Sequence, residues 1–250
     1  MINRPLFFAN WKMNHGPSEA RAYLAAFLNF FAPHDDRTVA MFPPALSLTT
    51  VRDTRANGTD ILLGVQNIHS QEKGAFTGEN SAPMARDAGA RLVLVGHSER
   101  RHVFGETNVE AASKAALASR FGLTPVLCVG ETLAQREMGD AARVVIEQLT
   151  VGINQIGPAA VAAIVIAYEP VWAIGTGHTA TPDDASAMHR VIRTTLRELA
   201  GNESDRAPIL YGGSVNRANA KTLLEVEGVD GLLVGGASLD PEGWAEICRT

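Results

Sequence analysis

The sequence has little cysteine and no long hydrophobic run. Only two of its 250 residues are cysteines, Cys128 and Cys248, which argues against a disulfide framework and favours a reducing compartment. No stretch approaches the ~18 consecutive apolar residues that a membrane-spanning helix requires. The N-terminal residues MINRPLFFANWKM lack the apolar core of a secretory signal. These absences predict a cytoplasmic protein that does not act at a membrane.

The sequence also lacks clusters of charge of one sign. It has 22 basic and 27 acidic residues, a formal net charge of −5, and no long run of either sign. Proteins that bind nucleic acid usually cluster Lys and Arg, so we expect no nucleic-acid partner. The histidines form no HExxH motif and no His/Cys cluster, and we therefore predict no metal site.

Eight short apolar runs alternate with amphipathic stretches along the chain. The runs are continuous rather than alternating in polarity, as expected for strands buried on both faces of a parallel sheet. They are LFFAN, TVAMF, ILLGVQ, RLVLVG, TPVLCVG, AAIVIAY, PILYGG and VDGLLVGG. No linker or low-complexity segment divides them. The pattern predicts a single α/β domain over residues 1–250, a (β/α)₈ barrel, with a doubly wound open sheet as the alternative.

Two of the intervening stretches carry clear signals for the start of a helix. In residues 107–121, Thr107 and Glu110 have the spacing of a capping box. In residues 181–200, Thr181 is followed by Pro182 at the first helical position. Both stretches are therefore predicted to be helices.

Polar residues follow nearly every predicted strand. These ends are Asn10-Trp11-Lys12, Gln66-Asn67, His97-Ser98-Glu99, Gly130-Glu131, Glu169-Pro170, Gly212-Gly213-Ser214 and Gly235-Gly236-Ala237-Ser238. In a parallel barrel all of them would lie at the carboxyl-terminal face, where such barrels build active sites. A purely structural protein has no need to gather Lys, His and Glu there, so the pattern favours an enzyme.

The segment AYEPVWAIGTG, residues 167–177, combines a carboxylate with an apolar loop. Glu169 ends a strongly apolar strand, so we expect a partly desolvated carboxylate whose protonated form is favoured, which would make it a better base. Pro170 and the two glycines, Gly175 and Gly177, can act as hinges around VWAI. Residues 170–177 are therefore predicted to be a lid that excludes water from the base.

Three further strand-end residues have the chemistry of a catalytic site. His97 precedes a possible short helix, whose positive end would favour the neutral imidazole as a hydrogen-bond donor. Lys12, with Asn10 beside it, could attract an anionic substrate and stabilise a developing oxyanion. Glu99 is the expected partner of Lys12.

Cys128 lies within a predicted strand, and we expect it to pack as a small apolar residue.

Paired glycines in YGGSV and VGGAS end the seventh and eighth predicted strands. Glycines allow backbone N–H groups to approach a ligand, and barrels commonly bind phosphate at this position. Together with Gly175 from the lid, the two pairs predict a phosphate site.

Residues 66–80 form a long predicted loop with an apolar tip around Phe76. An exposed Phe in such a loop needs a surface to bury it, and a partner subunit would supply one. The alternative is that Phe76 folds back on its own barrel.

Seven segments of the chain resemble those of the triosephosphate isomerase family, in the same order and at similar spacing over the whole length. They are FFANWKMN, GAFTGENS, LVLVGHSERR, VLCVGET, AYEPVWAIGTG, ILYGGSVN and LLVGGASL. The resemblance implies an isomerase of glycolysis and gluconeogenesis that interconverts dihydroxyacetone phosphate and D-glyceraldehyde 3-phosphate through an enediolate, without a cofactor.

The resemblance also implies a role for each matching residue. Glu169 would remove the proton, neutral His97 would polarise the carbonyl, and Lys12, beside Asn10, would offset negative charge. Backbone N–H groups of four residues would hold the phosphate: Gly175, Ser214, Gly235 and Gly236.

Further implied contacts concern the lid and a second subunit. Trp172 in the lid would have Glu131 as its partner. Thr77 would reach into the active site of the partner in a homodimer. His178 stands where many relatives carry lysine, which bears on the kinetics of the lid rather than on the chemistry.

Three other functions remain open from the residues alone. A barrel glycosidase could use Glu99 and Glu169, but the paired glycines would have no role on a neutral sugar. An aldolase could form a Schiff base on Lys12. A barrel could also bind sugar phosphates without turning them over.

Overall fold

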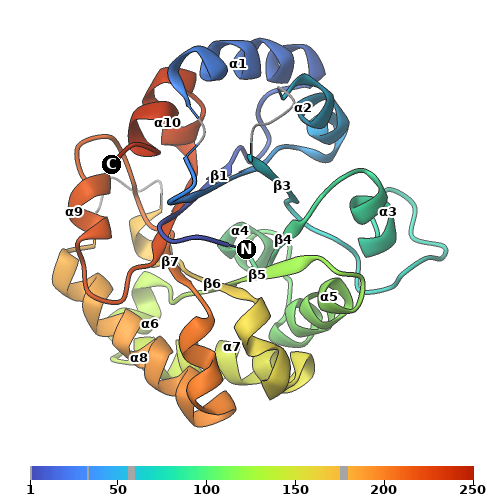
Figure 1. The fold of residues 1–250 in the computed structure, drawn as a ribbon. Helices are drawn as coiled ribbons and strands as arrows, with labels where there is room; N and C mark the ends of the chain where they lie inside the picture. Colours follow the sequence, from blue (N-terminus) through green and yellow to red (C-terminus); the bar gives the residue numbers. More distant parts are fainter. Residues whose placement is uncertain (1, 33, 56–59, 175–179) are drawn as a thin grey trace.

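The computed structural model describes residues 2–32, 34–55, 60–174 and 180–250. Figure 1 looks along a closed barrel of eight parallel strands, with the larger helices around it. The strands are β1 (Leu6–Asn10), β2 (Thr38–Phe42), β3 (Leu62–Val65), β4 (Leu92–Val95), β5 (Thr124–Val129), β6 (Val165–Tyr168), β7 (Ile209–Tyr211) and β8 (Gly231–Val234). They are arranged in chain order, and β8 closes the barrel by pairing with β1, Leu6 opposite Gly231. The predicted barrel is confirmed, and the open sheet is excluded.

Helices lie between the strands in sequence and around them in space (Figure 1). They are α1 (Pro17–Phe30), α2 (Leu48–Thr54), α3 (Ala82–Asp87), α4 (Ser98–His102), α5 (Asn108–Arg120), α6 (Leu133–Glu137), α7 (Ala141–Ile156), α8 (Pro182–Ala200), α9 (Ala220–Leu224) and α10 (Pro241–Ile247). None of these described helices is both long enough and apolar enough to cross a bilayer.

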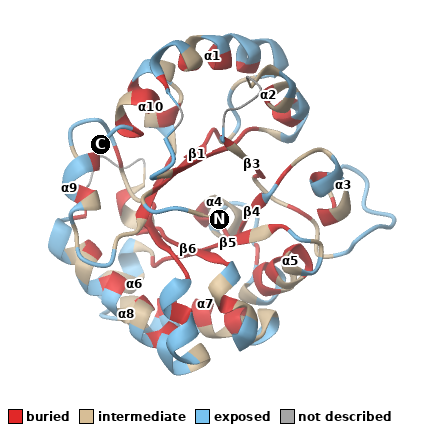
Figure 2. Ribbon diagram, viewed as in Figure 1, coloured by how far each residue is buried: buried red, intermediate tan, exposed pale blue. Residues whose placement is uncertain are grey.

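The strands are buried on both faces, which explains their continuous apolar runs (Figure 2). Because side chains alternate along a strand, Leu6 and Phe8 of β1 belong to the cluster inside the barrel. Phe7 and Ala9 belong to the larger cluster between the strands and the helices. Cys128 lies in the inner cluster, as predicted.

Both helix starts predicted from the sequence are present. Thr107 accepts a hydrogen bond from the backbone N–H of Glu110, and the Glu110 side chain accepts one from the Thr107 N–H, so α5 begins with a capping box. Thr181 and Asp184 form the same reciprocal pair at the start of α8. These local contacts satisfy helix N–H groups that would otherwise lack partners.

Candidate active site

The carboxyl ends of the strands surround a cavity of about 390 Å³. Seven of the predicted site residues line it: Asn10, Lys12, His97, Glu169, Ser214, Gly235 and Gly236. Gly175, the eighth, lies outside the described residues. Residues 226 positions apart in the sequence, Asn10 and Gly236, therefore meet because every parallel strand ends at the same face.

Glu169 follows β6 and is almost fully buried beneath this cavity. One carboxylate oxygen, Oε1, lies 3.0 Å from His97 Nε2, and the other accepts a hydrogen bond of 2.8 Å from the Ser98 N–H. Burial raises the pKa of Glu169, but His97, the Ser98 N–H and the Lys12 charge lower it, and the net shift is downward. The expectation that the protonated form of Glu169 would be favoured is therefore wrong, because these contacts outweigh the effect of burial.

His97 caps the amino end of α4, the short helix predicted to follow it. Its Nδ1 accepts a 3.3 Å hydrogen bond from the Glu99 N–H, which places the proton of a neutral ring on Nε2, next to Glu169. Asn10 Nδ2 lies 3.2 Å from the same Nε2. Burial lowers the pKa of His97, but the adjoining Glu169 carboxylate raises it, and the net shift is upward while the two groups touch. The hydrogen bond to Nδ1 favours the predicted neutral form.

Lys12 lies beside this pair and is held by its side chain and its backbone. Its Nζ forms an ion pair of 2.6 Å with Glu99 Oε1, as predicted. Its backbone has a φ of 51°, an uncommon value for a residue with a side chain. Asn10 Oδ1 accepts from the Lys12 N–H, and Gln66 Nε2 donates to the Lys12 carbonyl. Gln66 was noticed in the sequence as a strand-end residue, but this supporting contact was not predicted.

The opposite wall of the cavity consists of the loops after β7 and β8. Ser214 donates a hydrogen bond from Oγ to the carbonyl of Ala173, at the beginning of the predicted lid. Gly235 lies against Lys12, where an added Cβ would come within 3.2 Å of Lys12 Cε. A serine, two glycines and an ammonium group thus line the same cavity, a combination that suits an anionic ligand.

The first part of the lid packs on the end of β5. Val171–Ala173 forms a short 3₁₀ turn. Trp172 Nε1 donates a 2.7 Å hydrogen bond to Glu131 Oε1, which confirms the expected contact. The same oxygen accepts a 3.1 Å hydrogen bond from the Tyr168 hydroxyl, which was not predicted. The remaining lid residues, 175–177, and His178 lie outside the described part of the chain.

Gly130 was noted in the sequence as a strand-end residue, but its supporting role was not predicted. A Cβ at this position would lie 1.7 Å from the carbonyl oxygen of Glu169. Gln148 holds the Gly130 backbone from both sides, accepting from its N–H and donating to its carbonyl. Only glycine allows β5 to approach the base so closely. A glycine directly after an apolar strand was the available signal.

The structure gives no indication of a metal or thiolate among the residues it describes. No cluster of three or more His, Cys, Asp or Glu in the described ranges could hold a metal ion. Burial raises the pKa of the Cys128 thiol well above its usual value, so this group stays protonated.

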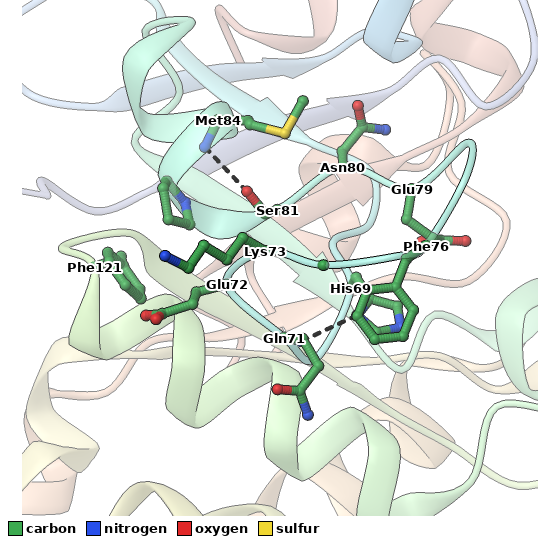
Figure 3. Close-up of a pocket in the computed structure, with 12 residues that line it drawn as sticks. His69, Gln71, Glu72, Lys73, Phe76, Glu79, Asn80, Ser81, Met84 and Phe121 are labelled. Atoms are coloured by element: carbon green, nitrogen blue, oxygen red, sulfur yellow. Dashed lines mark hydrogen bonds between the residues drawn. The ribbon is translucent and has the colours of Figure 1, made fainter.

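The loop 66–80 projects from the barrel beside α3 (Figure 1). At its base is a cavity of about 560 Å³, shown in Figure 3. The Phe76 ring stacks on His69 with centroids 3.8 Å apart, yet 42% of Phe76 is exposed. Phe76 therefore packs on a residue of its own loop, and part of its apolar surface remains exposed.

Comparison with known proteins agrees with the barrel architecture. The family model described as "Triosephosphate isomerase" matches residues 5–250. The triosephosphate isomerase of Roseiflexus sp. (strain RS-1) is 48% identical over 98% of this chain and 97% of its own. That of Aquifex aeolicus (strain VF5) is 44% identical over 98% of both chains. That of Chlamydia trachomatis serovar L2 is 43% identical over 99% of this chain and 90% of its own. The chain belongs to the triosephosphate isomerase family.

Proposed function

We propose that this protein interconverts dihydroxyacetone phosphate and D-glyceraldehyde 3-phosphate by proton transfer through an enediolate. This is an aldose–ketose isomerisation of glycolysis and gluconeogenesis, and it needs no cofactor. One observation carries the proposal: a buried carboxylate, an imidazole and an ammonium group line one cavity, with Glu169 Oε1 3.0 Å from His97 Nε2. The family match over residues 5–250 supports the choice of substrate.

Glu169 acts as the base. Its lowered pKa keeps it ionised at neutral pH, as a base must be before it accepts a proton. A substrate that enters between Glu169 and His97 separates the carboxylate from the groups that lower its pKa. The remaining burial then raises the proton affinity of Glu169, which favours removal of the proton next to the substrate carbonyl.

His97 and Lys12 stabilise the negative charge that this step creates. The Nε2–H of neutral His97, released from Glu169, donates to the substrate carbonyl oxygen and moves protons between the two oxygens. Separation from the carboxylate also leaves burial as the main influence on His97, which lowers its pKa and keeps the ring neutral. Lys12, with Asn10 beside it, offsets the charge of the enediolate and the phosphate.

The loops opposite the base hold the phosphate. The proposed ligands are backbone N–H groups of Gly175, Ser214, Gly235 and Gly236. Their support is the position of Ser214, Gly235 and Gly236 along the wall of the cavity that Lys12 also lines.

The lid, residues 170–177, closes over the bound substrate. An enediolate exposed to water can expel its phosphate by elimination, so closure protects the intermediate as well as excluding water. The hydrogen bond from Trp172 to Glu131 is an anchor for the beginning of the lid.

The functional unit is a homodimer of single-domain barrels, 1–250, located in the cytoplasm. Loop 66–80 inserts into the partner, with Phe76 buried there and Thr77 directed at the partner's active site. Support comes from two exposed apolar side chains, Met13 at 95% and Phe104 at 67% exposure. Both line a second cavity that also includes Lys12. Contiguous exposed apolar patches commonly mark sites of association between proteins.

The test is a coupled assay of D-glyceraldehyde 3-phosphate isomerisation on wild type, Glu169→Ala and Glu198→Ala. Glu198 is an exposed glutamate of α8 and serves as the matched control. Glu169→Ala is expected to lower kcat by at least ~10²–10⁴-fold, the usual scale for a positioned base, and Glu198→Ala to leave it unchanged. Equal turnover in the wild type and Glu169→Ala would refute the assigned base.

The same preparations separate the other functions. Covalent trapping of substrate on Lys12 by borohydride would indicate an aldolase. Intact phosphate binding by a wild-type protein without turnover would indicate a binding module. Failure of phosphate to compete at the site would favour a glycosidase.

A further inference from the structure

Arg136 of α6 contacts both the beginning of the lid and the helix that follows the lid. Its guanidinium carbon lies 4.6 Å from the centre of the Trp172 ring, within range of a cation–π interaction. Its Nη2 donates to Asp184 Oδ1 at 2.5 Å. Asp184 is in the first turn of α8, so one side chain joins the beginning of the lid to the helix that follows it.

Asp184 gives Arg136 a fixed anchor. The second oxygen of its carboxylate accepts hydrogen bonds from the backbone N–H and the hydroxyl of Thr181, at 3.0 and 2.8 Å. These contacts form the capping box of α8, whose geometry the helix itself maintains. The guanidinium that contacts the Trp172 ring is therefore also held by the amino end of α8.

Arg136 also acts on the carboxylate that binds Trp172. Glu131 is fully buried, and its Oε1 accepts hydrogen bonds from Trp172 and Tyr168. Arg136 Nη1 lies 3.9 Å from that oxygen. A buried carboxylate is costly unless a cation compensates it, so the Arg136 guanidinium offsets the burial of Glu131, the acceptor of the indole N–H.

We propose that Arg136 is a positioning residue of the isomerase, which sets the position of the lid over Glu169 through Trp172. The inference rests on the proposed function and adds a residue to its machinery. A planar guanidinium can stack on the indole, bind Asp184 and face Glu131 at once. The lysine ammonium is a compact charge that cannot maintain all three contacts.

The test compares Arg136→Lys with Arg143→Lys. Arg143 is an exposed residue of α7 that pairs with Asp140, so the control makes the same chemical change away from the lid. Arg136→Lys is expected to lower kcat about 10-fold and to raise the inorganic phosphate released per isomerisation several-fold, on the scale that small misplacements produce. Arg143→Lys is expected to match the wild type in both.

Release of phosphate distinguishes positioning from a purely structural role. A variant that is only less stable loses active molecules, whereas each remaining molecule retains the wild-type ratio of phosphate release to turnover. A lower melting temperature with an unchanged ratio and unchanged kcat would therefore overturn the proposal. Combining Arg136→Lys with Asp184→Asn should add little further loss, because both changes break the same contact.

Acrylamide quenching of tryptophan fluorescence supplies a measurement independent of activity. Trp11 and Trp244 are fully buried, so quenching reports chiefly on Trp172. Quenching should increase in Arg136→Lys and stay constant in Arg143→Lys. If the wild type showed no isomerisation, the proposed function would fail, yet this experiment would still decide whether Arg136 holds Trp172. Unchanged quenching would overturn the inference.

Discussion

His189 shows how the surroundings of a single residue control its chemistry. It lies fully buried on α8, with its ring edge toward Tyr168. Its Nδ1 is 2.8 Å from the carbonyl of Gly228, to which it donates, whereas Nε2 has no hydrogen-bond partner among the described residues. Burial lowers the pKa of His189 to about 4, so the ring is neutral in the folded protein at physiological pH.

This residue should make the protein sensitive to acid. The folded pKa of about 4 lies below the ordinary value of about 6.5, so the unfolded chain takes up the proton first as pH falls. The contribution of the neutral ring to the free energy of unfolding is fully present above pH ~6.5. It is lost progressively as the pH falls to ~4. Between pH 7 and pH 5 the wild type should lose about 2 kcal/mol more unfolding free energy than His189→Gln.

Denaturant unfolding at the two pH values measures this difference. His34→Gln, which replaces an exposed histidine, is the control and should follow the wild type. Identical pH dependence in the wild type and His189→Gln would contradict the prediction.

At the scale of the elements, the site depends on how closely the ends of neighbouring strands approach. The barrel places β5 beside β6 in parallel register, with Val129 opposite Tyr168. The next residues, Gly130 and Glu169, are therefore forced together. The Glu169 N–H donates to the Val129 carbonyl at 2.8 Å, so the base is tied to β5 by its backbone as well.

Gly130→Ala should consequently impair catalysis without removing any catalytic group. The new Cβ would lie 1.7 Å from the Glu169 carbonyl oxygen, and both are attached to backbone, so Glu169 must move by more than an ångström. We expect kcat to fall about 10²-fold, the scale reported for misplacements of this size. Steady-state kinetics would measure it.

Gly16→Ala is the matched control for this substitution. A Cβ at Gly16 would meet its nearest neighbour at 3.8 Å, an ordinary contact. Wild-type kinetics in Gly130→Ala would contradict the prediction. They would mean that the ends of β5 and β6 can separate without displacing Glu169.

At the scale of the whole molecule, apolar surface is left exposed at the loop 66–80 and beside the active-site mouth. The exposed side chains include Phe76, Met84, Met13 and Phe104. A barrel that satisfies its own core has no need of them, whereas a second copy of the chain would cover them. The proposed homodimer accounts for both surfaces.

Phe76→Glu should therefore weaken the dimer and reduce activity together. Burying an unpaired carboxylate in the interface is unfavourable, and the dissociation constant should rise by more than about 10-fold. Phe30→Glu is a close control, because Phe30 is 40% exposed against 42% for Phe76 and lies at the end of α1. Sedimentation velocity over a range of concentrations would report the change.

A monomeric wild type would refute the proposed dimer directly. A dimer equally stable in Phe76→Glu would show instead that the loop 66–80 does not form the interface.

Local sequence patterns determined the barrel and the residues at its mouth. Continuous apolar runs can be satisfied only where both faces of a strand are buried, and parallel strands bring their polar ends to one side. For the same reason the capping boxes at Thr107 and Thr181 were predictable, since their contacts span three residues. Position at a strand end was enough to identify four candidate site residues: Asn10, Lys12, His97 and Glu169.

Only the tertiary structure decided the state and the support of those groups. Glu169 has a lowered pKa because Ser98, 71 residues away, and His97 outweigh its burial. The approach of Gly130 and the contacts of Arg136 likewise join segments that are separate in the sequence. A pKa or a close contact depends on distances between such segments to within an ångström. Hydrophobic patterning determines which face a residue lies on, but those distances arise only when the barrel closes.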